Sequence, residues 1–147
     1  MNSSFMNRAI ELAKIAANKG EVPVGAVIVK DGKIIGEGYN MREQKKNALS
    51  HAETEAINAA CKTLGDWRLD NCTIYVTLEP CPMCAGAIIN ARISEVVFGA
   101  YDRQMGCMDS VTNIAALPFS AGTTVYGGIK EDECKKILTD FFEGVRK

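Results

Sequence analysis

The strongest constraint on the fold of this chain is a strand–helix–strand unit between residues 73 and 100. The apolar run TIYVTL at residues 73–78 predicts a buried strand, and EVVFGA at residues 95–100 predicts another. Between them, Pro82 suits the first turn of a helix, where the N–H that proline lacks would have no partner. Strands joined through a helix are parallel neighbours in a sheet whose faces are covered. We therefore expect a sheet with helices packed against it.

The remaining segments extend this sheet and its helical cover. Asp31-Gly32 separates two strand-like runs, and this dipeptide favours a tight hairpin turn because it tolerates positive φ. The predicted fold class is α/β, a three-layer α/β/α arrangement around a central mixed five-stranded sheet, with residues 1–147 as a single domain. The elements expected outside the first unit are helices at residues 5–19, 50–64 and 131–147, strands at 24–30, 33–40 and 123–127, and a loop at 41–49.

Composition narrows the class of protein. The chain has 147 residues, enough for one domain with a real core, and a formal net charge of −1, which gives no overall attraction to nucleic acid. No apolar run approaches the roughly 20 residues needed to cross a bilayer, and the N-terminal segment lacks the pattern of a secretion signal. We therefore expect a cytoplasmic location, no membrane partner, and reduced thiols for the six cysteines.

Three residues form a candidate metal site. The only histidine, His51, begins one predicted helix, and Cys81 and Cys84 begin another. One imidazole and two thiolates leave the fourth position of zinc free for water, which is the arrangement of catalytic zinc. Zinc lowers the pKa of a bound water to about 7. A helix N-terminus also favours thiolates, because its dipole and free N–H groups stabilise negative charge.

Glu53 is the candidate proton carrier. It lies two residues after His51, on the same helical turn, where it could reach a water at the metal without binding the metal itself. An alternative is structural, because Ser50-x-x-Glu53 matches a capping box, and that pattern taken alone favours capping.

The Cys-x-x-Cys pair also has alternatives. Taken alone, it suits a redox pair as well as a metal site, and a lone histidine is more often structural than a ligand. A redox or structural-zinc interaction module would give Glu53 no role, and the redox version would leave His51 without one. The combination His-x-Glu followed by Pro-Cys-x-x-Cys, both at helix starts, therefore favours a catalytic zinc site.

This combination is the signature of zinc-dependent nucleobase deaminases. The segments EVPVGAVIV, GEGYN, HAE, YVTLEPCPMCAGAI and VVFGAYD, with the closing DEC and FF, resemble the bacterial tRNA-specific adenosine deaminase family. The resemblance implies a cytidine deaminase-like fold, a homodimer, one zinc ion per chain and hydrolytic deamination. It also implies roles for particular residues: zinc ligation by His51, Cys81 and Cys84, proton transfer by Glu53, and substrate contacts from Asn40, Ala52, Pro80 and the rim that begins at Asp102.

Two substrate classes remain open at this stage. The overall resemblance favours the wobble adenosine in a tRNA anticodon loop, with inosine as the product. The alternative is a free nucleobase or nucleoside, such as guanine, cytosine or adenosine. Gln104 and Ser120-Ala121 favour it, because the family commonly has a lysine at the first position and an Asn-His pair at the second.

Other conspicuous residues are expected to be structural. Cys61, Cys72 and Cys134 are predicted to pack as small apolar side chains, and Trp67 to pack its loop onto the sheet. Cys107 lies in a loop expected near the pocket and has no evident partner.

Overall fold

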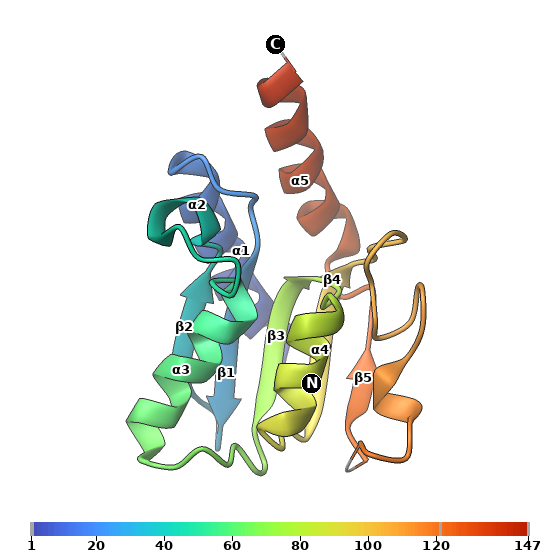
Figure 1. Cartoon of the computed structure of the whole chain (residues 1–147). Coiled ribbons are helices and arrows are strands. Elements are labelled where there is room, and N and C mark those ends of the chain that lie inside the picture. Colours follow the sequence, from blue (N-terminus) through green and yellow to red (C-terminus); the bar gives the residue numbers. More distant parts are fainter. Residues whose placement is uncertain (1, 121, 147) are drawn as a thin grey trace.

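A mixed sheet lies between two layers of helices in the computed structural model of the chain (Figure 1), which describes residues 2–120 and 122–146. The limits predicted at Met1 and Lys147, and the family departure at Ala121, lie outside the described residues. The spatial order of the strands is β2-β1-β3-β4-β5. The strands are β1 (Gly25–Lys30), β2 (Lys33–Tyr39), β3 (Thr73–Leu78), β4 (Glu95–Ala100) and β5 (Thr124–Tyr126).

Strand directions follow from the connections. β1 pairs antiparallel with both β2 and β3, whereas β3, β4 and β5 run parallel. The β1–β2 turn is made by Asp31 and Gly32, both with positive φ (52° and 75°), as the hairpin prediction requires. The predicted mixed sheet and the parallel strand–helix–strand unit are therefore confirmed.

Helices cover both faces of the sheet. Helices α1 (Ser4–Asn18) and α5 (Glu131–Arg146) pack on one face, and α3 (Ala52–Leu64) and α4 (Pro82–Asn90) pack on the other. Alternate residues of β1 enter the two layers, with Val27 facing α1 and Ile28 facing α3 and α4. The last turns of α5 extend past the end of the sheet (Figure 1).

Two short helices were not predicted. Residues 41–49, expected to be a loop, contain α2 (Arg42–Lys45), and η1 (Ile114–Ala116) precedes β5. The N–H groups of Glu43 and Gln44 in α2 donate to the carboxylate of Glu21, at 3.1 and 2.8 Å. This cap comes from a distant segment, so local sequence patterns gave no sign of it.

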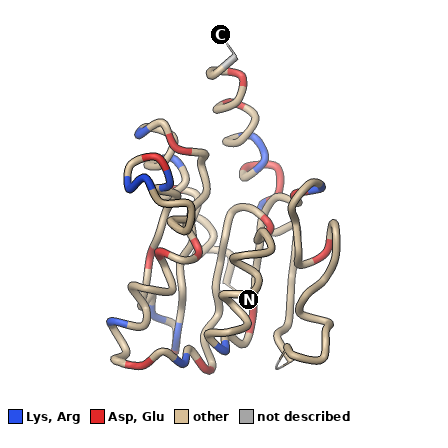
Figure 2. The backbone as a smooth tube through the Cα atoms, in the orientation of Figure 1, with Lys and Arg blue, Asp and Glu red and all other residues tan. Residues whose placement is uncertain are grey.

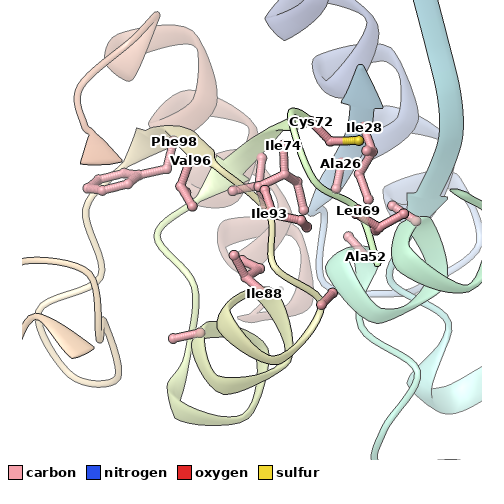
Figure 3. Close-up of a cluster of buried hydrophobic side chains, with 14 of the residues drawn as sticks. Ala26, Ile28, Ala52, Leu69, Cys72, Ile74, Ile88, Ile93, Val96 and Phe98 are labelled. Atoms are coloured by element: carbon pink, nitrogen blue, oxygen red, sulfur yellow. The ribbon is translucent and has the colours of Figure 1, made fainter. Parts of the chain in front are cut away.

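The larger core lies between the sheet and the α3–α4 layer. Figure 3 shows Ile74, Val96 and Phe98 of the sheet on the side occupied by Ile88 of α4. Cys72 belongs to this core and Cys134 to the core on the other face, so both confirm the packing prediction. Cys61 packs against the first core while half-buried.

The packing prediction for Trp67 is wrong. Its side chain is 51% exposed, and the guanidinium groups of Arg68 and Arg92 lie 4.6 and 5.7 Å from its ring centroid. The indole is therefore covered by two cations rather than by the sheet.

Most charged residues lie at the surface, and Glu21, Glu53 and Glu79 are the buried exceptions among the described residues. Figure 2 shows α4 and the central strand β3 without charge, and Lys and Arg positions on α2. None of the helices in the described part of the chain is long and apolar enough to span a membrane.

Close contact between β2 and α3 sets the position of α3. A Cβ atom at Gly36 would lie 2.5 Å from the carbonyl oxygen of Ala56, and one at Gly38 would lie 2.3 Å from that of Ala52. Only glycine lets the two backbones approach this closely.

Gly36→Ala should therefore lower the free energy of unfolding by about 1–3 kcal/mol, because the added methyl group meets helix backbone that cannot rotate away. Urea unfolding followed by circular dichroism measures this. Gly144→Ala on α5 is the control, since nothing lies within 4 Å of its added Cβ, and it should be neutral or stabilise by up to about 1 kcal/mol. Equal effects of the two substitutions would contradict the close-contact explanation.

Candidate active site

The predicted metal ligands meet at one edge of the sheet. β3 and β4 end at this edge, β1 begins there, and α3 and α4 both start there (Figure 1). His51 is the N-cap residue of α3 and Cys81 is the N-cap residue of α4. Two helix N-termini therefore converge on the same point, and their partial positive charges favour thiolate ligands there.

The three donor atoms are close enough to share one ion. The Nδ1 atom of His51 lies 3.7 Å from Sγ of Cys81 and 3.5 Å from Sγ of Cys84, and the donor atoms of all three residues lie within 4.8 Å of one another. Tetrahedral zinc, with bonds of about 2.3 Å to sulfur and 2.0–2.1 Å to nitrogen, places these two donor types about 3.6 Å apart. The donor set and its spacing therefore fit zinc.

Interactions within the cluster stabilise the thiolate form of Cys81. A hydrogen bond from the Cys84 thiol lowers the pKa of Cys81 to about 4, and His51 adds to this effect. The same thiolate raises the pKa of Cys84, together with burial, and raises the pKa of His51. Metal ligands must be deprotonated, so a bound cation would take the place of the proton that the two sulfurs share.

Glu53 faces this cluster from the first turn of α3. Its side chain is almost fully buried, and burial raises the pKa of its carboxyl group to about 7. The capping alternative is wrong, because the N-cap residue is His51 rather than Ser50. The backbone N–H of His51 donates to the hydroxyl of Thr54 at 3.0 Å, so Thr54 serves as the N3 partner. Glu53 is thereby left free to face the cavity.

A cavity of about 240 Å³ opens beside the cluster. Among the predicted site residues, His51, Glu53, Cys81, Asn40 and Asp102 line it. Cys84 lies behind Cys81, fully buried.

Asn40 carries an unpaired buried atom. No hydrogen-bond donor among the described residues reaches its Oδ1, although the residue is only 8% exposed. A buried carbonyl oxygen without a partner is costly, so this amide is available to a ligand in the cavity.

The other predicted substrate contacts lie deeper. Ala52 is fully buried at the start of α3, and the carbonyl oxygen of Pro80 accepts a hydrogen bond from the N–H of Cys107 at 2.9 Å. Neither lines the cavity. Cys107 is buried, and that hydrogen bond ties it to the strand end rather than to the cavity.

Part of the cavity wall comes from residues that the sequence patterns did not indicate. The segment EVPVGAV pointed to the family, yet the contribution of its valines to the cavity could not be read from it. The unpredicted lining residues are Val22, Val24, Arg42, Leu78 and Glu79, whereas Met105 belongs to the rim expected to begin at Asp102.

Comparison with known proteins places the chain in a family. The family model of MafB19-like deaminases matches residues 1–146. The tRNA-specific adenosine deaminase of Bacillus subtilis is 47% identical over 144 residues, which cover 97% of this chain and 89% of that protein. This chain belongs to the tRNA-specific adenosine deaminase family. Its members deaminate a base, so the chain is an enzyme of the deaminase class.

Solved structures agree with the fold of this deaminase. A structure from a study of A-to-I editing by tRNA:A34 deaminases at the wobble position is 39% identical, with a TM-score of 0.90 over 93% of this chain and all of that one. A guanine deaminase from Bacillus subtilis is 48% identical, with a TM-score of 0.65 over 69% of this chain and 66% of that one. The predicted cytidine deaminase-like architecture is confirmed.

Ionisation of the buried Glu53 carboxyl group should lower the free energy of unfolding of this deaminase. In protein freed of metal by a chelator, Glu53→Gln should raise the free energy of unfolding by about 1–3 kcal/mol near pH 8 and by much less near pH 4.5. The folded pKa is raised to about 7 from an ordinary 4.5, so ionisation favours the unfolded chain, and its cost grows through that interval.

Denaturant unfolding at both pH values measures this difference. The control is Glu55→Gln, which removes a carboxylate of the same helix that pairs with Lys45 at 2.8 Å. Its loss should lower stability by at most about 1 kcal/mol. A Glu53→Gln effect that does not depend on pH would contradict the prediction.

Proposed function

We propose that the chain is a zinc-dependent hydrolytic deaminase that converts the wobble adenosine of a tRNA to inosine and releases ammonia. The observation that carries this proposal is the cavity, in which Glu53 and the unpaired amide of Asn40 face the His51-Cys81-Cys84 cluster. Family membership supports the choice of adenosine in tRNA, since relatives over nearly the whole chain carry that name.

His51, Cys81 and Cys84 would hold one zinc ion per chain. When bound there, zinc supplies a water whose pKa is near neutral. The chain itself provides the apolar part of the wall, through Val22, Val24 and Leu78. These side chains exclude bulk water and strengthen electrostatic interactions within the cavity.

Glu53 would move the protons. Its carboxylate would accept a proton from the attacking water and deliver it to the ring nitrogen next to carbon 6. It would then take the second proton from the newly added hydroxyl group and give it to the departing amino group. A carbon–oxygen bond forms at carbon 6, the carbon–nitrogen bond breaks, and ammonia leaves. Burial favours the protonated form of this carboxyl group, which helps it to hold a proton between the two transfers.

The cavity is the right size for a base alone. Drug-sized ligands occupy pockets of about 300–1,000 Å³, and this cavity holds about 240 Å³. A flipped base would enter it while the ribose and phosphates stay outside. Asn40 would hydrogen-bond the base, Asp102 would contact it at the rim, and the backbone at Ala52 and Pro80 would support the pocket floor.

Exposed basic side chains flank the mouth of the cavity and suit RNA phosphates. Arg42 lines the cavity, Lys45 and Lys46 follow it in and beside α2, and Arg103 lies on the opposite rim. This local cluster of basic side chains can attract RNA phosphates, although the net charge of the whole chain, −1, does not favour nucleic acid. We propose a homodimer on the ground of family membership.

A free base such as guanine is the second candidate. Gln104 and Ser120 differ from the residues common in the family, and the partly matching guanine deaminase shows that similar chains act on a small substrate. The Ser120 hydroxyl donates to the carbonyl oxygen of Ala115, so its side chain has a local partner. Gln104 contacts Asp102 through its backbone N–H, which does not depend on the glutamine side chain.

Zinc-loaded protein should release ammonia from an anticodon stem-loop that begins with adenosine, and not from free adenine, guanine, cytosine or adenosine. Mass spectrometry of the stem-loop should show inosine at the first anticodon position. Because phosphate contacts weaken with salt, kcat/KM for the stem-loop should fall steeply between low and moderate ionic strength. Turnover of a free base with an untouched stem-loop would instead establish the second candidate.

Glu53→Gln should retain one zinc per chain and lose at least about 10²-fold in kcat, the usual contribution of positioned proton transfer. His51→Ala should lose the zinc as well as the activity. Metal content by atomic absorption, measured beside ammonia release, separates the two. Glu55→Gln serves as the matched control and should retain both. Substantial deamination by Glu53→Gln would remove Glu53 from the mechanism.

A further inference from the structure

The carboxylate of Glu79 is buried directly after β3 and is saturated with hydrogen bonds. Its side chain is 2% exposed. Oε1 accepts from the N–H of Asp102 at 3.0 Å and from the hydroxyl of Ser110, and Oε2 accepts from the N–H groups of Met108 and Ser110 at 3.2 and 2.8 Å. A carboxylate offers about four acceptor sites, so none remains for a substrate.

The loop of residues 102–110 is wrapped tightly around this group. A Cβ atom at Gly106 would lie 2.3 Å from Cδ of Glu79 and 2.4 Å from the carbonyl oxygen of Asp102. The N–H of Gly106 donates to that same carbonyl oxygen at 2.8 Å. Only a glycine lets the loop close on the carboxylate in this way.

This loop forms one wall of the cavity. Asp102 and Met105 line it, and Oδ1 of Asp102 accepts the N–H groups of Gln104 and Met105, both at 3.1 Å. Residues 103–105 are exposed, with Met105 at 52%, whereas Cys107 and Met108 are buried in the core. The hydrogen bond from the N–H of Asp102 to Glu79 therefore anchors the exposed part of this rim.

A second buried carboxylate serves another part of the wall. Glu21 is 1% exposed and accepts the N–H groups of Glu43 and Gln44, beside the cavity-lining Arg42. Each of these two loops is therefore held by one buried carboxylate, and the two carboxylates can be changed independently.

We propose that Glu79 is a positioning residue that holds the 102–110 loop as a fixed wall for the incoming base, and so determines substrate affinity more than the chemical step. Without these hydrogen bonds, the loop must be ordered when substrate binds, and that entropy cost weakens binding. The kinetic part of this proposal rests on the proposed function. The structural part does not.

Glu79→Gln is the test, because the amide places an N–H₂ group against donors that need an acceptor. KM for the stem-loop should rise about tenfold or more, as for the loss of a hydrogen bond to a charged group, while kcat falls less than KM rises. Trypsin should cleave after Arg103 at least several-fold faster, with cleavage after Arg42, Lys45 and Lys46 unchanged. Zinc content should stay at the wild-type value.

Glu21→Gln is the matched control and should show the opposite cleavage pattern, faster in residues 42–46 and unchanged after Arg103. Gly106→Ala keeps the carboxylate but pushes the loop from it, so it should reproduce the Glu79→Gln pattern even if that variant fails to fold. Unchanged cleavage after Arg103, an unchanged KM, or zinc loss in a folded Glu79→Gln protein would overturn the proposal. If the wild type does not act on the stem-loop, proteolysis and zinc content still decide the structural part.

Discussion

The convergence of the α3 and α4 N-termini at the end of β3 is the contact on which the site depends. It brings the imidazole of His51 within 3.5–3.7 Å of two sulfurs that lie far away in the sequence. The approach of α3 is set by glycines of β2, where any side chain would meet helix backbone. The approach of α4 is set by β3, whose end leads directly to Cys81. A shift of either helix would separate donors that must share one ion.

Helices and loops contribute different parts of the site. The candidate metal ligands and Glu53 are carried by helix starts packed on the sheet, which hold a side chain more accurately than a loop does. Two parts of the rim come from loops, one in residues 41–46 and one in residues 102–110, and each loop is tied to a buried carboxylate. Substrate contacts can therefore vary in these loops while the chemical centre keeps its geometry.

Sequence patterns predicted most of the regular elements and the three residues that meet as a candidate metal site, His51, Cys81 and Cys84, because both depend on short-range regularities. Short apolar and strand-like runs located the five strands, and Asp31-Gly32 located the hairpin turn. Predictions failed where contacts between side chains, rather than a local pattern, decided the outcome. Glu21 caps α2 in a segment expected to be a loop, and Trp67, expected to pack onto the sheet, is half-exposed beside Arg68 and Arg92.

The sequence by itself determined the fold class and the residues of the chemical centre. Hydrophobic periodicity dictates the elements. The combination of His51 and Glu53 with Cys81 and Cys84, at these spacings, favours a catalytic zinc site over a redox pair or a structural one. Only the tertiary structure decided that Glu53 is free of its helix, that Asn40 has an unpaired oxygen in the cavity, and that Glu79 holds the opposite wall. Each of these depends on which polar groups are left with a partner after packing. For Asn40 and Glu79 that is settled by contacts between residues far apart in the chain, and for Glu53 by the hydrogen bond between His51 and Thr54.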